Sequence, residues 1–235
     1  MNKRIKIKAH PSKWKICTEG VTEANYLKMY IKALGIDKYI IVNCKDTAES
    51  GCGKQHEALL DKMQSCGRSW NVEQVFLVHD YDKAEEQKEA KASFNITFKR
   101  AKKESDFIVI YSNPCFEYWL LLHNDFIDSN LQRNIFQEKV KDICNKKRAD
   151  KKMEPLHDDK YKSDPMLYEY FGGYNNSRQA RKYAIKRFAE NGKQSKPIKS
   201  IKSFSSEYYA NKTPCTNMFE LLDALDKYAR QIKYE

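Results

Sequence analysis

The sequence predicts an α/β protein in which a four-stranded, mainly parallel sheet is flanked by helices and followed by a C-terminal helical extension. In the first half, short apolar and β-branched segments alternate with longer segments of helical periodicity, the pattern of parallel sheets. The short segments are apolar almost throughout, as expected for strands buried on both faces. After about residue 115 the apolar residues recur at helical spacing.

Four segments are predicted as strands because each is short, apolar and closed by turn residues. They are residues 14–18, 39–44, 74–79 and 107–111. Between them, the apolar spacing predicts a helix that begins near Thr22 and ends at Gly35. The other predicted helices cover residues 54–66, 83–103, 116–122, 135–143, 177–190 and 217–233.

These elements divide the chain into a core at residues 1–125 and a helical extension at residues 126–235 that packs on the core. Within the extension, residues 145–165 are rich in charged side chains and poor in apolar ones. We therefore expect a charged loop at about 145–165.

Charge and hydropathy indicate a cytoplasmic protein with a polyanionic partner. The longest apolar run, residues 118–122, is too short to span a bilayer, and the basic N-terminal stretch lacks the apolar segment of a secretory signal. The net charge is +11, from 43 Lys and Arg against 32 Asp and Glu. This excess favours nucleic acid, although basic cytosolic proteins without such a partner are common.

Acidic residues follow three of the four predicted strands. Glu19 ends the first strand, Asp80 and Asp82 follow the third, and Glu117 lies just beyond the fourth, while Glu23 is one helical turn from Glu19. The carboxyl ends of parallel strands meet at one edge of a sheet, where ligands bind. Carboxylates gathered there must be protonated or neutralised by a cation, and Mg²⁺, or Mn²⁺ in its place, suits oxygen ligands.

Some of these acids also have a purely structural explanation. An acid in the first turn of a helix is favoured by the helix dipole, which applies to Glu23 and Glu117. The Asp80-x-Asp82 pair has the spacing of a metal-binding pair, but such pairs also cap helices. Glu19, at a strand tip beside a glycine, has no comparable structural explanation and is the best single candidate.

The combination of a glutamate after the first strand and a D-x-D pair after the third resembles the Toprim pattern. More narrowly, four segments spanning residues 16–225 resemble the signature blocks of the RloB-like family. They are TEGVTEANYL, VHDYD, YSNPCFEYWLLLH and NKTPCTNMFELLDAL, of which the third is the most specific.

The resemblance implies a Toprim-like catalytic core and a metal-dependent nuclease that acts on RNA, tRNA among its candidates, or on DNA in bacterial anti-phage defence. It implies Glu19, Asp80 and Asp82 as the catalytic residues, with Glu19 as the general acid and base. All three are expected to hold the metal, with Glu23 and Glu117 as accessory ligands. It also implies work beside a partner such as an ATPase or another defence-system protein, with no membrane involvement.

A basic stripe is predicted on the helix at residues 177–190, formed by Arg178, Arg181, Lys182 and Lys186. Lysines and aromatic residues continue through residues 193–209. Basic and aromatic side chains together can hold a phosphate backbone and stack unpaired bases. A solvated helix face would have the same composition.

Two alternatives to the nuclease stay open. One is a nucleic-acid binding or sensing subunit of a defence complex with a non-hydrolytic site. The other is a nucleotidyl transferase, which uses the same acids. The intact acids favour an enzyme, because a protein that only binds phosphate gains by losing them.

Overall fold

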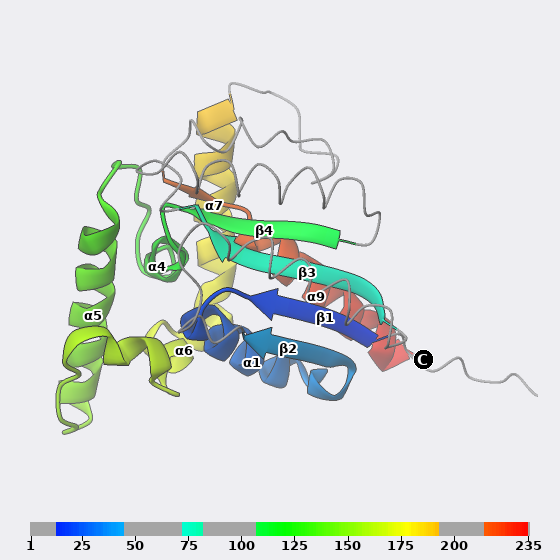
Figure 1. The fold of residues 1–235 in the computed structure, drawn as a ribbon, viewed down its shortest axis with the longest axis horizontal. Coiled ribbons are helices and arrows are strands. Elements are labelled where there is room, and N and C mark those ends of the chain that lie inside the picture. The colour runs from blue at the N-terminus through cyan, green and yellow to red at the C-terminus, as the bar shows by residue number, and fades with distance from the viewer. Residues whose placement is uncertain (1–12, 45–71, 82–106, 193–213, 235) are drawn as a thin grey trace, which may run out of the picture.

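The computed structural model describes residues 13–44, 72–81, 107–192 and 214–234 (Figure 1). Its five strands form one mixed sheet in the order β2-β1-β3-β4-β5, in which the first four are parallel and β5 is antiparallel to β4. The strands are β1 Lys13–Thr18, β2 Ile40–Cys44, β3 Val72–Asp80, β4 Phe107–Asn113 and β5 Cys215–Thr216. The predicted α/β fold and its four parallel strands are confirmed.

Helices occupy most of the rest of the described chain. They are α1 Val21–Leu34, α4 Phe116–Leu121, α5 Arg133–Asp150, α6 Leu167–Tyr170, α7 Gly173–Gly192 and α9 Met218–Tyr234, with 3₁₀ turns η1 Asp37–Tyr39 and η2 Asp158–Ser163. Helix α1 ends at Gly35, whose φ of 73° is in the left-handed region that favours glycine. The predicted helices at 54–66 and 83–103 lie outside the described residues. None of the described helices is long and apolar enough to cross a membrane.

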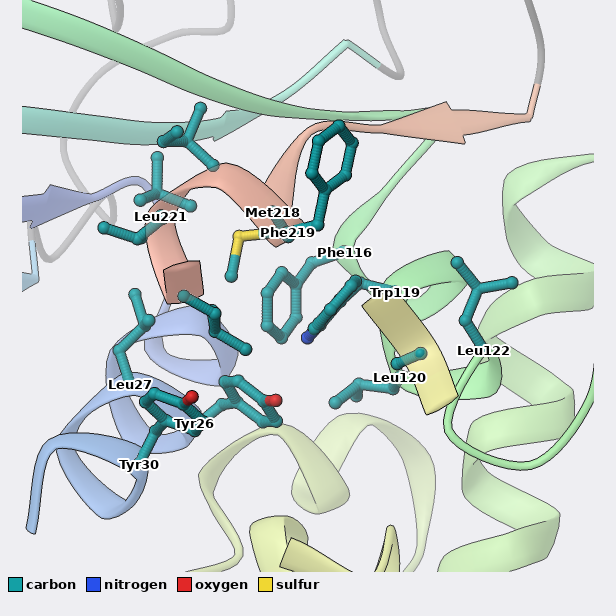
Figure 2. Packing of buried hydrophobic residues seen from close by; sticks show 14 of the residues in the cluster. Tyr26, Leu27, Tyr30, Phe116, Trp119, Leu120, Leu122, Met218, Phe219 and Leu221 are labelled. Atoms are coloured by element: carbon teal, nitrogen blue, oxygen red, sulfur yellow. The ribbon is translucent and has the colours of Figure 1, made fainter. Parts of the chain in front are cut away.

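The core lies where α1, α4 and α9 meet (Figure 2). Tyr26 of α1 packs edge-on against Phe116 and Trp119 of α4, with ring centroids 5.6 and 6.3 Å apart. Met218 and Leu221 of α9 are fully buried in the same cluster. Burial of these large side chains fixes α1 and α4, which begin just beyond β1 and β4, against the sheet.

The C-terminal segment completes the sheet through Asn217. Its side-chain Oδ1 accepts a hydrogen bond from the Tyr111 backbone N–H at 2.7 Å, and its Nδ2 donates to the Val109 carbonyl at 3.1 Å. The amide therefore pairs with β4 as a strand residue would, immediately before α9 begins. Strand β5 was not predicted, because a strand of two residues is too short to show an alternation of apolar and polar side chains.

The expectation of a charged loop at about 145–165 is corrected in part. Helix α5 continues through Asp150, and η2 forms within the segment. Asn145 of α5 pairs with Leu156 in both directions, accepting from its N–H at 2.7 Å and donating to its carbonyl at 3.2 Å. Arg148 forms an ion pair with Asp164 at 2.8 Å. Polar contacts, rather than apolar burial, hold this segment on α5. Its low apolar content therefore predicted a loop where the chain is in fact ordered against the helix.

A carboxylate pocket at the sheet edge

A pocket of about 340 Å³ opens where β1 and β3 end and α1 and α4 begin. Four of the predicted acidic residues line it together, namely Glu19, Glu23, Asp80 and Glu117. Its volume is at the small end of the roughly 300–1,000 Å³ typical of ligand pockets. The fifth predicted acid, Asp82, lies outside the described residues.

Glu19 connects the ends of two neighbouring strands. Its backbone N–H donates to the Val78 carbonyl at 3.0 Å, which extends the pairing of β1 with β3 by one residue. Its side-chain Oε2 accepts a hydrogen bond from the backbone N–H of Asp80 at 3.2 Å. The parallel register therefore sets Glu19 beside Asp80, although 61 positions separate them in the sequence.

Gly20 makes room for the carboxylate of Glu23. The backbone of Gly20 is extended, with φ of −118°, so its conformation does not require glycine. The requirement is steric, because a Cβ on residue 20 would lie 2.5 Å from Glu23 Oε2. The glycine in this turn thus allows an acid on the first turn of α1 to fold back over the strand end.

Glu117 is held by a residue that the sequence analysis did not single out. The Tyr161 hydroxyl donates a 2.7 Å hydrogen bond to Glu117 Oε1, and both side chains are buried, with residue exposures of 1% and 3%. Tyr161 lies on η2, within the segment expected to be a loop. Its isolated position among charged residues gave no signal of burial.

Burial makes two of the pocket acids, Glu23 and Asp80, reluctant to ionise. It raises the pKa of Glu23 to about 8, with further upward contributions from the charges of Glu19 and Glu117. The pKa of Asp80 is also raised well above its ordinary range, first by burial and then by the neighbouring Glu23, Glu19 and Glu117. The pocket therefore concentrates negative charge that only protons or a cation can neutralise.

Basic residues also line the pocket. Arg133, the first residue of α5, lowers the pKa of both Glu23 and Asp80 through its charge. Lys162 on η2 contacts Asp159 at 2.9 Å, and both residues belong to the pocket lining. Neither Arg133 nor Lys162 was singled out from the sequence.

The donor chemistry of the pocket fits a hard divalent cation. Oxygen ligands from several carboxylates are what Mg²⁺ and Mn²⁺ prefer, and four carboxylate side chains line this pocket. Within the described ranges, no three His, Cys, Asp or Glu side chains already stand in a metal-binding arrangement.

The predicted basic stripe divides into two parts on α7. Arg178, Lys182 and Lys186 are exposed on the helix. Arg181 instead faces α9, where its Nη1 contacts Asp223 at 2.9 Å and Asp226 at 2.8 Å. Arg181 therefore links α7 to α9 through ion pairs. The lysine- and aromatic-rich continuation at residues 193–209 falls outside the described residues.

The described geometry defines a class of protein: an α/β protein with a carboxylate pocket at the carboxyl edge of a mostly parallel sheet. A family model described as RloB-like protein matches residues 15–225, nearly the whole chain. The chain therefore belongs to the RloB-like protein family. No curated protein and no solved structure gave a match.

Proposed function

We propose that the protein is a metal-dependent nuclease that hydrolyses phosphodiester bonds in RNA, with tRNA among its candidate substrates, or in DNA. The observation that carries this proposal is the convergence of Glu19, Glu23, Asp80 and Glu117 on one pocket. Four acids from three separate parts of the chain, two of them buried and two partly buried, are costly to hold together unless a cation or a reaction uses them. The Toprim-like pattern of Glu19 and Asp80 at strand ends supports the same assignment.

The residues that would hold Mg²⁺, or Mn²⁺, are Asp80, Glu23 and Glu117, together with Asp82 beyond the described segment. When bound, such an ion supplies Lewis-acid polarisation of the scissile phosphate. Glu23 and Glu117 are almost fully buried, at 4% and 3% exposure, whereas Glu19 and Asp80 are partly exposed. Tyr161 fixes the orientation of Glu117 by its hydrogen bond.

Glu19 is the proposed general acid and base. It is less buried than Glu23, and the Asp80 N–H holds one of its oxygens at 3.2 Å. That hydrogen bond leaves the second oxygen of Glu19 to exchange a proton with the attacking water or the leaving oxygen. The same bond orients the side chain toward the residues that would hold the ion.

The proposed biological setting rests on the family resemblance and on charge. A net charge of +11 favours a nucleic-acid partner in the cytoplasm. The resemblance supports a role in anti-phage defence beside an ATPase or another defence-system protein.

The test is incubation of the purified protein with Mg²⁺ or Mn²⁺ and with DNA, total RNA or tRNA, with and without nucleoside triphosphates. We expect metal-dependent cleavage that Glu19→Gln and Asp80→Asn each reduce by about 100-fold or more. Glutamine at position 19 keeps a carbonyl oxygen that can accept from the Asp80 N–H, so the fold should be retained. Exposed Glu154→Gln is the matched charge control.

Three results would contradict the nuclease assignment. Full activity in either purified pocket variant would remove the acids from the reaction. Extension of a nucleic acid with nucleoside triphosphates would indicate a nucleotidyl transferase. Retention of nucleic acid without any chemical change, at every metal tested, would indicate a binding or sensing subunit.

A further inference from the structure

We propose that Arg133 and Lys162 form a basic wall of the carboxylate pocket and bind a phosphodiester group of the substrate. This inference rests on the proposed nuclease function and deepens it by assigning the contacts to the substrate backbone. Both residues line the pocket with Glu19, Glu23, Asp80 and Glu117. The pocket therefore brings groups for a cation and groups for an anion into one space.

The position of Arg133 is unfavourable for its own helix. It is the first residue of α5, where the partial positive charge of the helix dipole disfavours a cation. The first turn of α5 carries no acidic residue, and Gln132 at the N-cap makes no side-chain capping hydrogen bond. A residue that runs against the local preference of its helix is typical of a functional position.

Arg133 lies at the same pocket as two of the predicted metal ligands. It lines the pocket with Glu23 and Asp80, so its positive charge lies at the space that a substrate phosphate would enter. A planar guanidinium can donate two parallel hydrogen bonds to a phosphate. A cation bound by the carboxylates would take over the neutralisation of Glu23 and Asp80 and allow Arg133 to contact an anion.

Lys162 is placed to contribute a second contact. Its Nζ pairs with Asp159 Oδ2 at 2.9 Å, and the Asp159 side chain is 71% exposed. An ion pair this exposed contributes little stability, so a phosphate can replace Asp159 as the partner of Lys162. Asp159, Lys162 and Ser163 all come from η2, which also positions Tyr161 on Glu117.

The start of α1 belongs to the acidic side of the pocket. Gly20, Val21 and Thr22 line it, and the Glu23 carboxylate lies close against Gly20. The anion-binding contacts are therefore those of Arg133 and Lys162. Contacts of these kinds recognise the backbone and read no base. The ligand class is therefore a phosphodiester of RNA or DNA.

The test measures binding separately from cleavage. A fluorescently labelled single-stranded oligonucleotide is titrated with protein in Ca²⁺ over a range of salt concentrations, and Mn²⁺ affinity is measured by calorimetry without nucleic acid. We expect Arg133→Gln to weaken oligonucleotide binding about tenfold or more and to reduce the slope of log K against log salt by about 0.7, the value for one phosphate on a single strand. Arg133→Lys should restore part of the affinity.

Lys147→Gln, an exposed charge removal on the same helix, is the matched control and should change neither quantity. Lys162→Gln should weaken binding less than Arg133→Gln. Oligonucleotide affinity and salt slope in Arg133→Gln equal to those of Lys147→Gln, with Mn²⁺ binding intact, would overturn the inference and leave Arg133 as a counter-ion of the carboxylates. Absence of cleavage by the wild-type protein, with the Arg133 effect on binding preserved, would overturn only the nuclease function.

Discussion

The backbone N–H of Asp80 donates a hydrogen bond to the carboxylate of Glu19 at 3.2 Å, joining the carboxyl ends of β1 and β3. Neither residue could reach the other without the parallel pairing that sets Thr18 opposite Val78. The bond fixes the acid of one strand to the backbone of the next, so the geometry of the pocket depends on the register of the sheet.

Gly20→Ala should displace the Glu23 carboxylate and weaken metal binding while leaving the fold intact. The new methyl group would stand where Glu23 Oε2 now lies, and the flexible end of that side chain can move away. We expect Mn²⁺ affinity, measured by calorimetry, to fall several-fold with little change in melting temperature. Ile185→Ala, at an exposed position outside the pocket lining, is the control, and unchanged Mn²⁺ affinity in Gly20→Ala would contradict the steric role of Gly20.

Tyr161→Phe should lower metal affinity by about 10-fold or more, the usual cost of losing a residue that orients a ligand. The substitution removes only the hydroxyl that donates to Glu117 at 2.7 Å. Tyr118→Phe is a matched control, because that hydroxyl donates to the Ile127 carbonyl outside the pocket lining. Equal metal affinities in the two variants would show that Tyr161 has no role in positioning Glu117.

The metal-free protein should lose stability as the pH rises from 5 to 8. Folding raises the pKa of Glu23 from 4.5 to about 8, so its contribution is fully present below 4.5 and is lost as pH rises through about 8. The loss should amount to a few kcal/mol, since each pKa unit corresponds to about 1.4 kcal/mol. Chemical denaturation at several pH values measures it.

Glu23→Gln should flatten this pH dependence, whereas Glu154→Gln should not. The pKa of Glu220 is raised to about 7 by burial and contributes a loss of the same sign, so the comparison of variants isolates Glu23. Mg²⁺ should stabilise the wild-type protein more at pH 8 than at pH 6, because it needs deprotonated ligands. A pH-independent effect of Mg²⁺ would place its binding elsewhere.

Arg181 and Arg178 should respond differently to loss of charge. Arg181→Gln should destabilise the protein by about 2–4 kcal/mol, because it leaves Asp226 without the partner that links α7 to α9. Exposed Arg178→Gln should leave stability unchanged.

The exposed residues of the basic stripe give a separate prediction for nucleic-acid binding. If they contact nucleic acid, charge reversal at Arg178 and Lys182 should weaken the binding and reduce its salt dependence. Unchanged affinity over a salt titration would remove the stripe from the interface.

The sequence was sufficient for the parallel strands and for the convergence of the strand-end acids. Strand segments are recognisable from local composition, and parallel pairing brings their carboxyl ends to one edge. Glu19 and Asp80 follow from those two facts alone. Glu117 follows because it lies a few residues beyond the end of β4.

The pocket contacts of Tyr161 and Arg133 and the ion pairs of Arg181 could not be predicted in this way. Tyr161 is buried and donates a hydrogen bond to Glu117, which lies 44 positions earlier in the sequence. The segment around Tyr161 has a low apolar content and does not indicate burial. Arg181 lies beside the exposed residues of the stripe, and its contacts with Tyr30 of α1 and with Asp223 and Asp226 of α9 distinguish it. Periodicity along one helix specifies a face, whereas the partner of that face depends on the packing of distant elements.

The hydrogen bond from Tyr161 to Glu117 has a practical consequence for dissecting the molecule. Cleaving the chain near residue 125 would separate the strand-end acids from Arg133, Tyr161 and Lys162, and would also strip β4 of its antiparallel neighbour β5. An isolated N-terminal fragment would thus keep the acids of the pocket and lose the residues that cover and orient them. Inactivity of such a fragment would reflect the loss of Arg133, Tyr161 and Lys162 and would not argue against a catalytic role of the acids.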